Sequence, residues 1–324
     1  MDALLNWLFE GDPWVVYGTC RWRLGEPGDS PVVQAARQQM LAHPFIRGLI
    51  TELQGWPGVT ISNHKNAGAL FHKLAFAADL GLTKDDPGMD EVIERVLANQ
   101  SEQGPFQLRS NTPLHFGGSG EDVYAWALCD APLILYALAC FGLGADARVR
   151  RGVEHLVSLA RANGWPCAVS PEMGRFRGPG RKEDPCPFAT LIMLRLLSAI
   201  PDLRESEPAR LGAAALLDLW EKRETTHPYI FYMGTDFCKL KFPLVWYDIL
   251  HVTSVLARFP WLAGDPRLEE MRRVLRAKAD AEGRYTIESS WIVWKEQEFG
   301  RKKQPSRALT LQVLRAINQE QFLS

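Results

Sequence analysis

The chain has 324 residues, of which 46% are hydrophobic and 23% are charged, so it can bury the core of a globular protein. Its 37 basic and 38 acidic side chains give a formal net charge of -1, which does not draw the protein to nucleic acid or to an anionic membrane surface. The N-terminal residues lack a secretory-signal pattern and no run of about 18 apolar residues occurs, so we expect a cytoplasmic protein without a membrane span.

The cysteines and tryptophans indicate which kinds of stabilising or binding site the protein can contain. Six cysteines in a chain of this length are too few for a disulfide scaffold, so in a reducing cytoplasm we expect thiols or metal ligands. Eleven tryptophans indicate aromatic packing between helices or an aromatic-lined cavity.

Along the chain, residues 1–30 have the pattern of a partial helical unit, and three later stretches repeat one pattern. Each stretch contains, in order, the end of an apolar helix, a short turn, and an amphipathic helix that begins at an aspartate. A glycine and then a bulky residue follow this helix. Aspartate favours helix N-termini and glycine favours helix C-termini, so both boundaries have a physical reason. The stretches are 78–106 with Asp86, 139–166 with Asp146, and 257–285 with Asp265.

A second and more apolar helix accompanies each unit, after a long segment rich in Pro, Gly, Ser and basic residues. A helix that is apolar on nearly all sides must be buried, so five such helices at one period indicate a shared centre. The five helices begin at intervals of roughly sixty residues, near Ala67, Cys129, Pro185, Tyr247 and Ser306.

An open solenoid and a closed barrel both satisfy this pattern. The long segments all join the end of an outer helix to the start of an inner helix, so they gather at one end of the molecule, where long loops usually carry function. A closed ring also needs no capping repeats, and residues 1–30 would complete it. We therefore predict an all-α protein whose single domain, residues 1–324, is an α/α toroid, a closed barrel of about five to six helix hairpins.

The period and two tracts resemble the terpenoid-cyclase and protein-prenyltransferase superfamily of α/α toroids. LANQSEQGPF, residues 97–106, is similar to the Q-x-x-x-G-x-F/W repeat of squalene-type cyclases, and GTDFCKLKFPLVWYDILHVTSVL occupies residues 234–256. The LKF-P-x-x-x-x-D tract that ends at Asp248 and the closing tract 283–311 resemble uncharacterised bacterial proteins with prenyltransferase or squalene-oxidase repeats. This resemblance implies a toroid fold and an enzyme that acts on an isoprenoid-like substrate.

The sequence departs from both branches of that superfamily at their reactive groups. Class II cyclases protonate an alkene with an Asp-x-Asp-Asp acid, which this sequence lacks, since Asp85-Asp86 stands at an expected outer-helix cap. Prenyltransferases bind zinc through an Asp-x-Cys tract and a later histidine. Asp236-Phe237-Cys238 and His251 are similar to that set, although the histidine follows much sooner.

The starts of the inner helices carry metal-ligating side chains that a ring would bring to one rim. Zinc is held by Cys, His and Asp in tetrahedral sites, and a catalytic site leaves one position open. We therefore predict a zinc ion bound by Cys129, Cys186 and Asp248, with Cys238, His251 or Asp184 as the reserve ligand. The structural alternative is that the cysteines are small buried residues and the aspartates are helix caps.

The same positions supply candidate catalytic groups. Asp248 and His251 are three residues apart on one helix, so the carboxylate and the imidazole would share a face and form an acid/base pair. A buried pair that only satisfies itself is the alternative. Asp130 and Asp184 are the other candidate catalytic carboxylates.

Basic residues precede three inner helices. Helix N-termini expose N–H groups and positive partial charge, so Arg and Lys beside them favour an anion such as a diphosphate. The alternative is a solvated loop whose charges only keep it soluble. The predicted anion-binding residues are Arg175, Arg177, Arg181, Lys182, Lys239, Lys241 and Arg307, with Arg301, Lys302 and Lys303 nearby.

Aromatic residues near these helix ends are candidates for lining a cavity. His64, Trp126, Trp246 and Trp294 would contact an apolar ligand or stabilise a cation through a ring face. Ordinary core packing is the alternative fate of the tryptophans. The glycine-rich tract at 115–122 is expected to be a flexible loop over the cavity.

Three functions remain open from the sequence. The leading one is a toroid enzyme, prenyltransferase-like or lyase/cyclase-like, that takes a small hydrophobic or amphiphilic anionic ligand in a central cavity with zinc as cofactor. The second is a non-catalytic binding protein with the same cavity. The third is a carbohydrate-active helical barrel, which needs two carboxylates across the cavity, from Asp130, Asp184 and Asp248.

Overall fold

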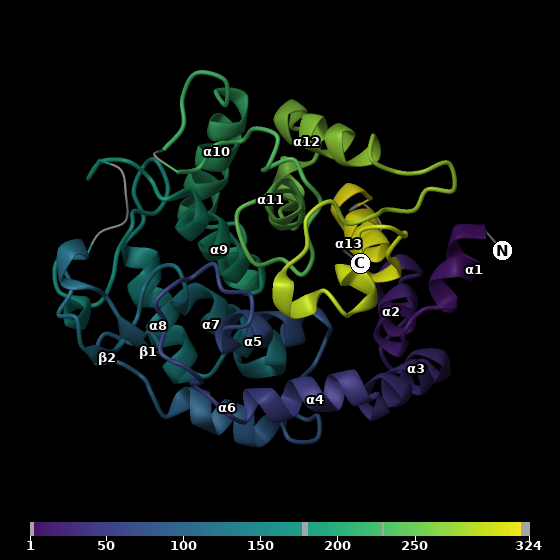
Figure 1. The fold of residues 1–324 in the computed structure, drawn as a ribbon, viewed down its shortest axis with the longest axis horizontal. Coiled ribbons are helices and arrows are strands. Elements are labelled where there is room, and N and C mark those ends of the chain that lie inside the picture. Colours follow the sequence, from purple (N-terminus) through teal and green to yellow (C-terminus); the bar gives the residue numbers. More distant parts are fainter. Residues whose placement is uncertain (1–2, 177–180, 229, 319–324) are drawn as a thin grey trace. The chain divides into compact units, whose positions relative to one another are not determined.

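The computed structural model describes residues 3–176, 181–228 and 230–318, and within these ranges the protein is mostly helical (Figure 1). The only sheet in the described ranges has two short strands, which agrees with the predicted all-α class. The chain divides into two compact units. We call Leu49–Tyr232 the middle unit, and Met1–Gly48 together with Met233–Ser324 the terminal unit. Within the same ranges, no helix is both long and apolar enough to cross a membrane.

Three inner helices form the core of the middle unit: α5 (Leu70–Asp79), α7 (Ala131–Leu138) and α9 (Pro187–Ser198). Helix α7 packs against α5 and against α9 (Figure 1). Every residue of α7 and α9 is buried. These helices begin within a few residues of the predicted starts, because an apolar run that must be buried on all sides leaves little choice of position.

Three amphipathic helices accompany them: α6 (Met89–Leu97), α8 (Ala147–Ser158) and α10 (Glu207–Glu221). Helix α8 packs against α7 and α10 packs against α9. Each outer helix buries one stripe and exposes the rest, as on α8, where Val149, Val153 and Leu156 are buried.

The terminal unit contains α1 (Ala3–Phe9), α2 (Pro13–Gly18), α3 (Pro31–Ala42), α11 (Ile249–Leu256), α12 (Pro266–Arg276) and α13 (Arg307–Ile317). Helix α4 (Pro44–Leu53) begins in the terminal unit and ends in the middle unit. Helix α13 packs against α11 and α12 and also against α1 and α2, so the first and last helices of the described ranges touch. Two π-helical turns, Thr19–Arg23 and Ala139–Leu143, extend α2 and α7.

The glycines predicted to close the repeats have the backbone conformation that the prediction requires. Gly104, Gly164 and Gly283 have φ angles of 113°, 100° and 76°, a region that side chains with a Cβ rarely adopt. The bulky residues that follow, Phe106, Trp165 and Tyr285, are buried. The sequence pattern therefore identified real turns.

In two of the inner helices, α9 and α13, a threonine hydroxyl accepts a hydrogen bond from the turn that precedes the helix. The Trp165 N–H donates to the Thr190 hydroxyl at 2.9 Å, and the Cys186 N–H donates to the Trp165 carbonyl at 2.7 Å. The terminal unit repeats the arrangement. The Tyr285 N–H donates to the Thr310 hydroxyl at 2.9 Å, and the Ser306 N–H donates to the Tyr285 carbonyl at 2.8 Å. The two units thus share one structural repeat.

One predicted helix cap is wrong. Asp146 and Asp265 cap α8 and α12 as expected, since their carboxylates accept the N–H groups of Arg148 and Arg267. Asp86 instead accepts the Thr83 N–H at 2.7 Å. Pro87 and Gly88 form a turn in which the Met89 N–H donates to the Asp86 carbonyl, so α6 begins after Gly88.

The long segment between α6 and α7 contains a hairpin that the sequence analysis did not predict. Strands β1 (Leu108–Asn111) and β2 (Asp122–Ala125) pair antiparallel, with Leu108 opposite Ala125. Asp122 accepts hydrogen bonds from Thr60 and Asn111, and each strand has only four residues. The glycine-rich tract 115–122 forms most of the hairpin connection.

A buried ion pair links the three inner helices of the middle unit. Arg195 of α9 is fully buried and pairs with Asp79 of α5, which is 8% exposed. Tyr136 of α7 donates to the same carboxylate at 2.8 Å, and the Arg195 guanidinium lies 4.5 Å from the Tyr136 ring centroid. One residue from each helix therefore takes part.

Replacing Asp79 by Asn should lower the free energy of unfolding by about 3–5 kcal/mol, because it leaves the Arg195 charge buried without its counter-ion. Chemical denaturation measures this loss. The double variant D79L/R195M should lose less than D79N alone, since it buries no charge. As a control, E205Q removes the exposed partner of Arg210 and should change stability by at most about 1 kcal/mol. Equal losses in D79N and E205Q would contradict the prediction.

Candidate functional site

The inner helices share one N-terminal position, at which a residue's carbonyl accepts the N–H of the residue four positions further on. In α5 this residue is Ala69, and in the other four inner helices it is polar or a cysteine. Asp130 and Cys186 hold this position in the middle unit, and Asp248 and Ser306 hold it in the terminal unit. Serine is an ordinary helix cap. The other three are residues that the sequence analysis selected as candidate ligands or catalytic groups.

In the middle unit, Asp130 forms a carboxylate–imidazole pair with His64. The Nε2 atom of His64 lies 2.8 Å from Oδ2 of Asp130, and Oδ1 of Asp130 accepts the Ala127 N–H at 3.1 Å. The Asp130 side chain is fully buried and the His64 side chain is 18% exposed. Within the described ranges no partner is seen for the second ring nitrogen, Nδ1. The carboxylate orients the imidazole while that nitrogen remains available.

A second histidine fixes the backbone of the first. Nε2 of His72 lies 2.7 Å from the His64 carbonyl oxygen. Burial lowers the pKa of His72 to about 3, so its ring is neutral at physiological pH and Nε2–H is the donor. His64 is therefore held through its side chain by Asp130 and through its carbonyl by His72.

Three cysteines of the middle unit lie on neighbouring chain segments. The Leu128 N–H donates to the Ala168 carbonyl at 2.9 Å and the Cys186 N–H donates to the Trp165 carbonyl. Segment 165–168, which contains Cys167, therefore runs beside the starts of both α7 and α9. The Cys129 and Cys186 thiols form a hydrogen bond, and Cys167 interacts electrostatically with Cys129.

The two hydrogen-bonded thiols differ in acidity. The hydrogen bond to Cys186, together with burial, raises the pKa of Cys129 well above its usual value. The same hydrogen bond lowers the pKa of Cys186, and the N–H groups at the start of α9 add to this effect against the opposing effect of burial. Cys186 is therefore the thiol of the pair that loses its proton first.

In the terminal unit, Asp248 caps α11 and does not form the predicted side-chain pair with His251. Its Oδ1 accepts the backbone N–H of His251 at 3.0 Å, whereas the His251 imidazole contacts the Trp246 carbonyl at 2.8 Å. The helix start turns the backbone of His251, not its ring, toward Asp248. Among the described residues, Oδ2 of Asp248 has no hydrogen-bond partner. Burial raises the pKa of Asp248 to about 7.

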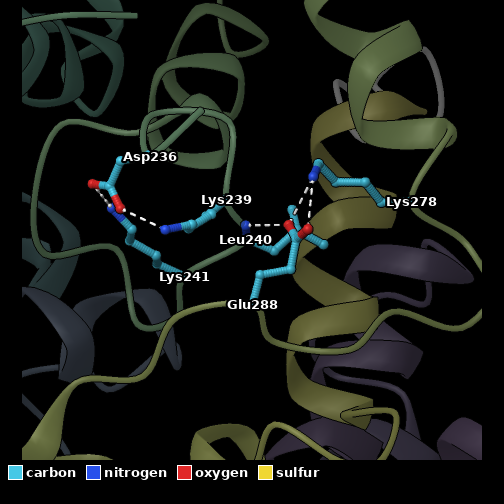
Figure 2. A network of polar contacts seen from close by, with 6 residues as sticks. All are labelled: Asp236, Lys239, Leu240, Lys241, Lys278 and Glu288. Carbon is cyan, nitrogen blue, oxygen red and sulfur yellow. Dashed lines mark hydrogen bonds and ion pairs between the residues drawn. The ribbon is translucent and has the colours of Figure 1, made fainter. Parts of the chain in front are cut away.

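Lys239 and Lys241, two predicted anion-binding residues, both pair with Asp236 (Figure 2). Their Nζ atoms lie 3.2 Å and 2.9 Å from its two carboxylate oxygens. The pKa of Asp236 is lowered, first by Lys241. Glu288 holds the chain between the two lysines, since it accepts the Leu240 N–H at 2.7 Å. The Asp236 carboxylate therefore neutralises part of the positive charge with which Lys239 and Lys241 would bind an anion.

The remaining predicted anion-binding residues have different surroundings. Arg175, Arg181 and Lys182 are exposed in the segment before α9, and Arg177 lies outside the described residues. Arg307 donates to the Trp7 carbonyl at 2.7 Å and pairs with Glu10, so it joins α13 to α1. 

The other candidate residues from the sequence have the following surroundings. Asp184 accepts the Arg181 N–H at 2.9 Å within the loop before α9. Trp126 is buried, and its indole donates to Gln103 at 2.9 Å. Trp294 is buried against Phe45 and Phe299, whereas Trp246 is partly exposed.

The predicted zinc ligands are divided between the units. Cys129 and Cys186 belong to the middle unit, and Asp248 and Cys238 belong to the terminal unit. In the part of the chain that the structure describes, no group of three or more His, Cys, Asp or Glu side chains is arranged to hold a metal ion. The zinc site stays a prediction, and no chemical step below depends on it.

Two features of this site were missed from the sequence. Cys167 was not selected, although it follows the buried Trp165 turn that the repeat pattern had already located. His64 was selected as a lining residue and not as the partner of Asp130, because residues 66 positions apart give no local signal of contact.

Comparison with known proteins does not assign a family. No protein-family model matches the chain, and no curated protein is significantly similar to it.

The raised pKa of Asp248 makes stability depend on pH. The folded protein holds this proton up to about pH 7, while the unfolded chain releases it near 3.8, so the contribution of Asp248 is lost as pH rises between these values. Asn keeps the cap but does not titrate. Relative to D248N, the wild type should therefore lose about 4 kcal/mol of unfolding free energy from about pH 4 to pH 8.

Urea denaturation across this range measures the difference. D146N is the matched control, because Asp146 also caps a helix but its pKa is lowered to about 2, mainly by Arg148. Its difference from wild type should stay nearly constant from pH 5 to pH 8. A pH-independent difference for D248N would show that Asp248 does not titrate there.

Proposed function

We propose that the protein is an enzyme that moves a proton on a hydrophobic or amphiphilic substrate through the His64–Asp130 pair. The observation that carries this proposal is the contact of 2.8 Å between a partly exposed imidazole and a fully buried carboxylate. A carboxylate that orients an imidazole and stabilises its protonated form is the usual partner of a histidine acid/base.

The proposed step uses the two nitrogens of His64 differently. Nε2–H donates to Asp130, so Nδ1 accepts a proton from the substrate and later returns it. Asp130 keeps the imidazole oriented throughout this exchange. His72 keeps the imidazole in place by holding the carbonyl of His64.

The apolar helices beside this pair support a substrate with an apolar part. Helix α7, which begins directly after Asp130, consists of buried residues only. Exposed Arg175, Arg181 and Lys182 in the loop before α9 are the candidates for an anionic head group. An isoprenyl diphosphate has both features.

The proposal includes the architecture predicted from the sequence. We propose that the inner and outer helices close into an α/α toroid around a substrate cavity, as the resemblance to cyclases and prenyltransferases implies. The shared turn in which a threonine holds an aromatic residue supports a common repeat in both units.

Farnesyl diphosphate is the probe for this function. We expect the wild type to bind it more tightly than inorganic diphosphate or farnesol, because only the whole molecule engages both the basic and the apolar regions. H64Q and D130N should retain binding but lower turnover about 10²–10⁴-fold, as loss of a general acid/base does. Calorimetry measures binding and mass spectrometry of the products measures turnover.

The control variant is H227Q, which changes an exposed histidine of the same unit and should leave turnover unchanged. Binding without turnover in the wild type would favour the non-catalytic alternative. The absence of binding by all three probes would remove the isoprenoid proposal, and unchanged turnover in H64Q would remove the catalytic role of the pair.

Zinc binding is proposed separately, from the sequence pattern of Cys129, Cys186 and Asp248. Protein purified without added metal should contain close to one zinc ion per chain, and C129S or C186S should lose it. C140S is the matched control, because Cys140 is a partly exposed thiol outside the predicted ligand set. Elemental analysis measures the metal content, and metal-free wild type with undiminished thermal stability would refute the site.

A further inference from the structure

We propose that Cys129 and Cys186 form an oxidisable dithiol site, at which a hydroperoxide joins the starts of α7 and α9 by a disulfide. This inference rests on the position of the thiols and is independent of the proton transfer proposed for His64.

The first support is that the backbone holds both cysteines to one common segment. Leu128, next to Cys129, donates to Ala168, and Cys186 itself donates to Trp165. Helices α7 and α9 also pack directly on each other, so the two helix starts cannot separate without breaking the core. The effect of each thiol on the pKa of the other agrees with this arrangement.

The second support is that helix capping does not explain a cysteine at position 186. The equivalent position of α13 is Ser306, whose hydroxyl accepts the Leu309 N–H at 3.1 Å. A thiol is a weaker hydrogen-bond acceptor than a hydroxyl and a poorer cap. Cysteine at this position therefore offers reactivity that serine lacks.

The third support is access for a small oxidant. Cys129 packs at the edge of a small apolar cluster with Ala127 and Met173, yet both Cys129 and Cys186 remain partly exposed. Because both sulfurs are desolvated although the residues are partly exposed, the oxidant must be as small as a hydroperoxide, whereas Cys20 is buried as a whole residue.

The chemistry balances with the hydroperoxide as the only added reactant. The Cys186 sulfur attacks one peroxide oxygen, the O–O bond breaks, and a sulfenic acid and water or an alcohol are formed. The Cys129 sulfur then displaces hydroxide from the sulfenic acid, and this hydroxide takes the Cys129 thiol proton, so an S–S bond and one water are formed in this step. Two thiols are oxidised and one peroxide is reduced.

The test treats the full-length native protein with hydrogen peroxide, blocks remaining thiols with iodoacetamide, and maps disulfides by mass spectrometry. We expect one intramolecular disulfide between the peptides of Cys129 and Cys186, reversible by dithiothreitol. It should be absent in C129S and in C186S, and present in C140S and C167S. Protein treated with a chelator and protein as purified are compared, so that bound zinc is recognised as a protecting ligand.

Three outcomes would overturn the proposal. One is a disulfide that joins a different pair in the native protein. Another is a Cys129–Cys186 disulfide that forms no faster in native protein than in protein unfolded by guanidinium, because the fold would then contribute nothing. The last is a pair that stays reduced in chelator-treated native protein. Circular dichroism of each variant shows whether a lost disulfide reflects a lost thiol or a lost fold.

Discussion

The buried ion pair between Arg195 and Asp79 is the constraint on which the middle unit depends. A guanidinium without solvent contact must keep its counter-ion, because an unpaired buried charge costs several kcal/mol. Since Asp79 is also bound by Tyr136, the pair fixes α5, α7 and α9 relative to one another. A satisfied pair of this kind adds little net stability, but it penalises any other arrangement of the three helices.

This constraint matters for the opposite ends of the same helices. Asp79 and Arg195 lie toward the C-terminal ends of α5 and α9, whereas Asp130 and Cys186 stand at the N-terminal ends of α7 and α9. Rigid helices carry the fixed spacing from one end to the other. The contact of His64 with Asp130 and that of Cys129 with Cys186 are therefore supported by packing and not by loops alone.

The sequence was most informative where local chemistry decides structure. An apolar run buried on all sides, an aspartate before a helix and a glycine after one act over a few residues, and the starts of α7 and α9 and the turn at Gly164 follow from them. The cap at Asp86 failed because Pro87 and Gly88 favour a turn of their own. The two strands of four residues were too short for an alternating pattern to be recognised.

Contacts between distant segments could not be predicted in this way. The spacing of Asp248 and His251 suggested an acid/base pair because the two residues share a helical face. The N-terminal turn of α11 instead gave Asp248 a backbone partner. Asp130 obtained an imidazole from His64, which belongs to another repeat. Which repeat supplies the partner is decided by tertiary packing, and periodicity carries no information about it.

The four cap positions also separate stability from reactivity. Ser306 shows that an ordinary cap serves this position well. Asp248 caps equally well but buries a carboxyl with one oxygen unpartnered, and Cys186 replaces a good acceptor by a poor one. Each replacement lowers stability without a structural benefit in the described residues. A residue that lowers stability at a cap position is expected to serve a purpose other than folding. The caps of α9 and α11 are therefore better candidates for reactive groups than the basic loops.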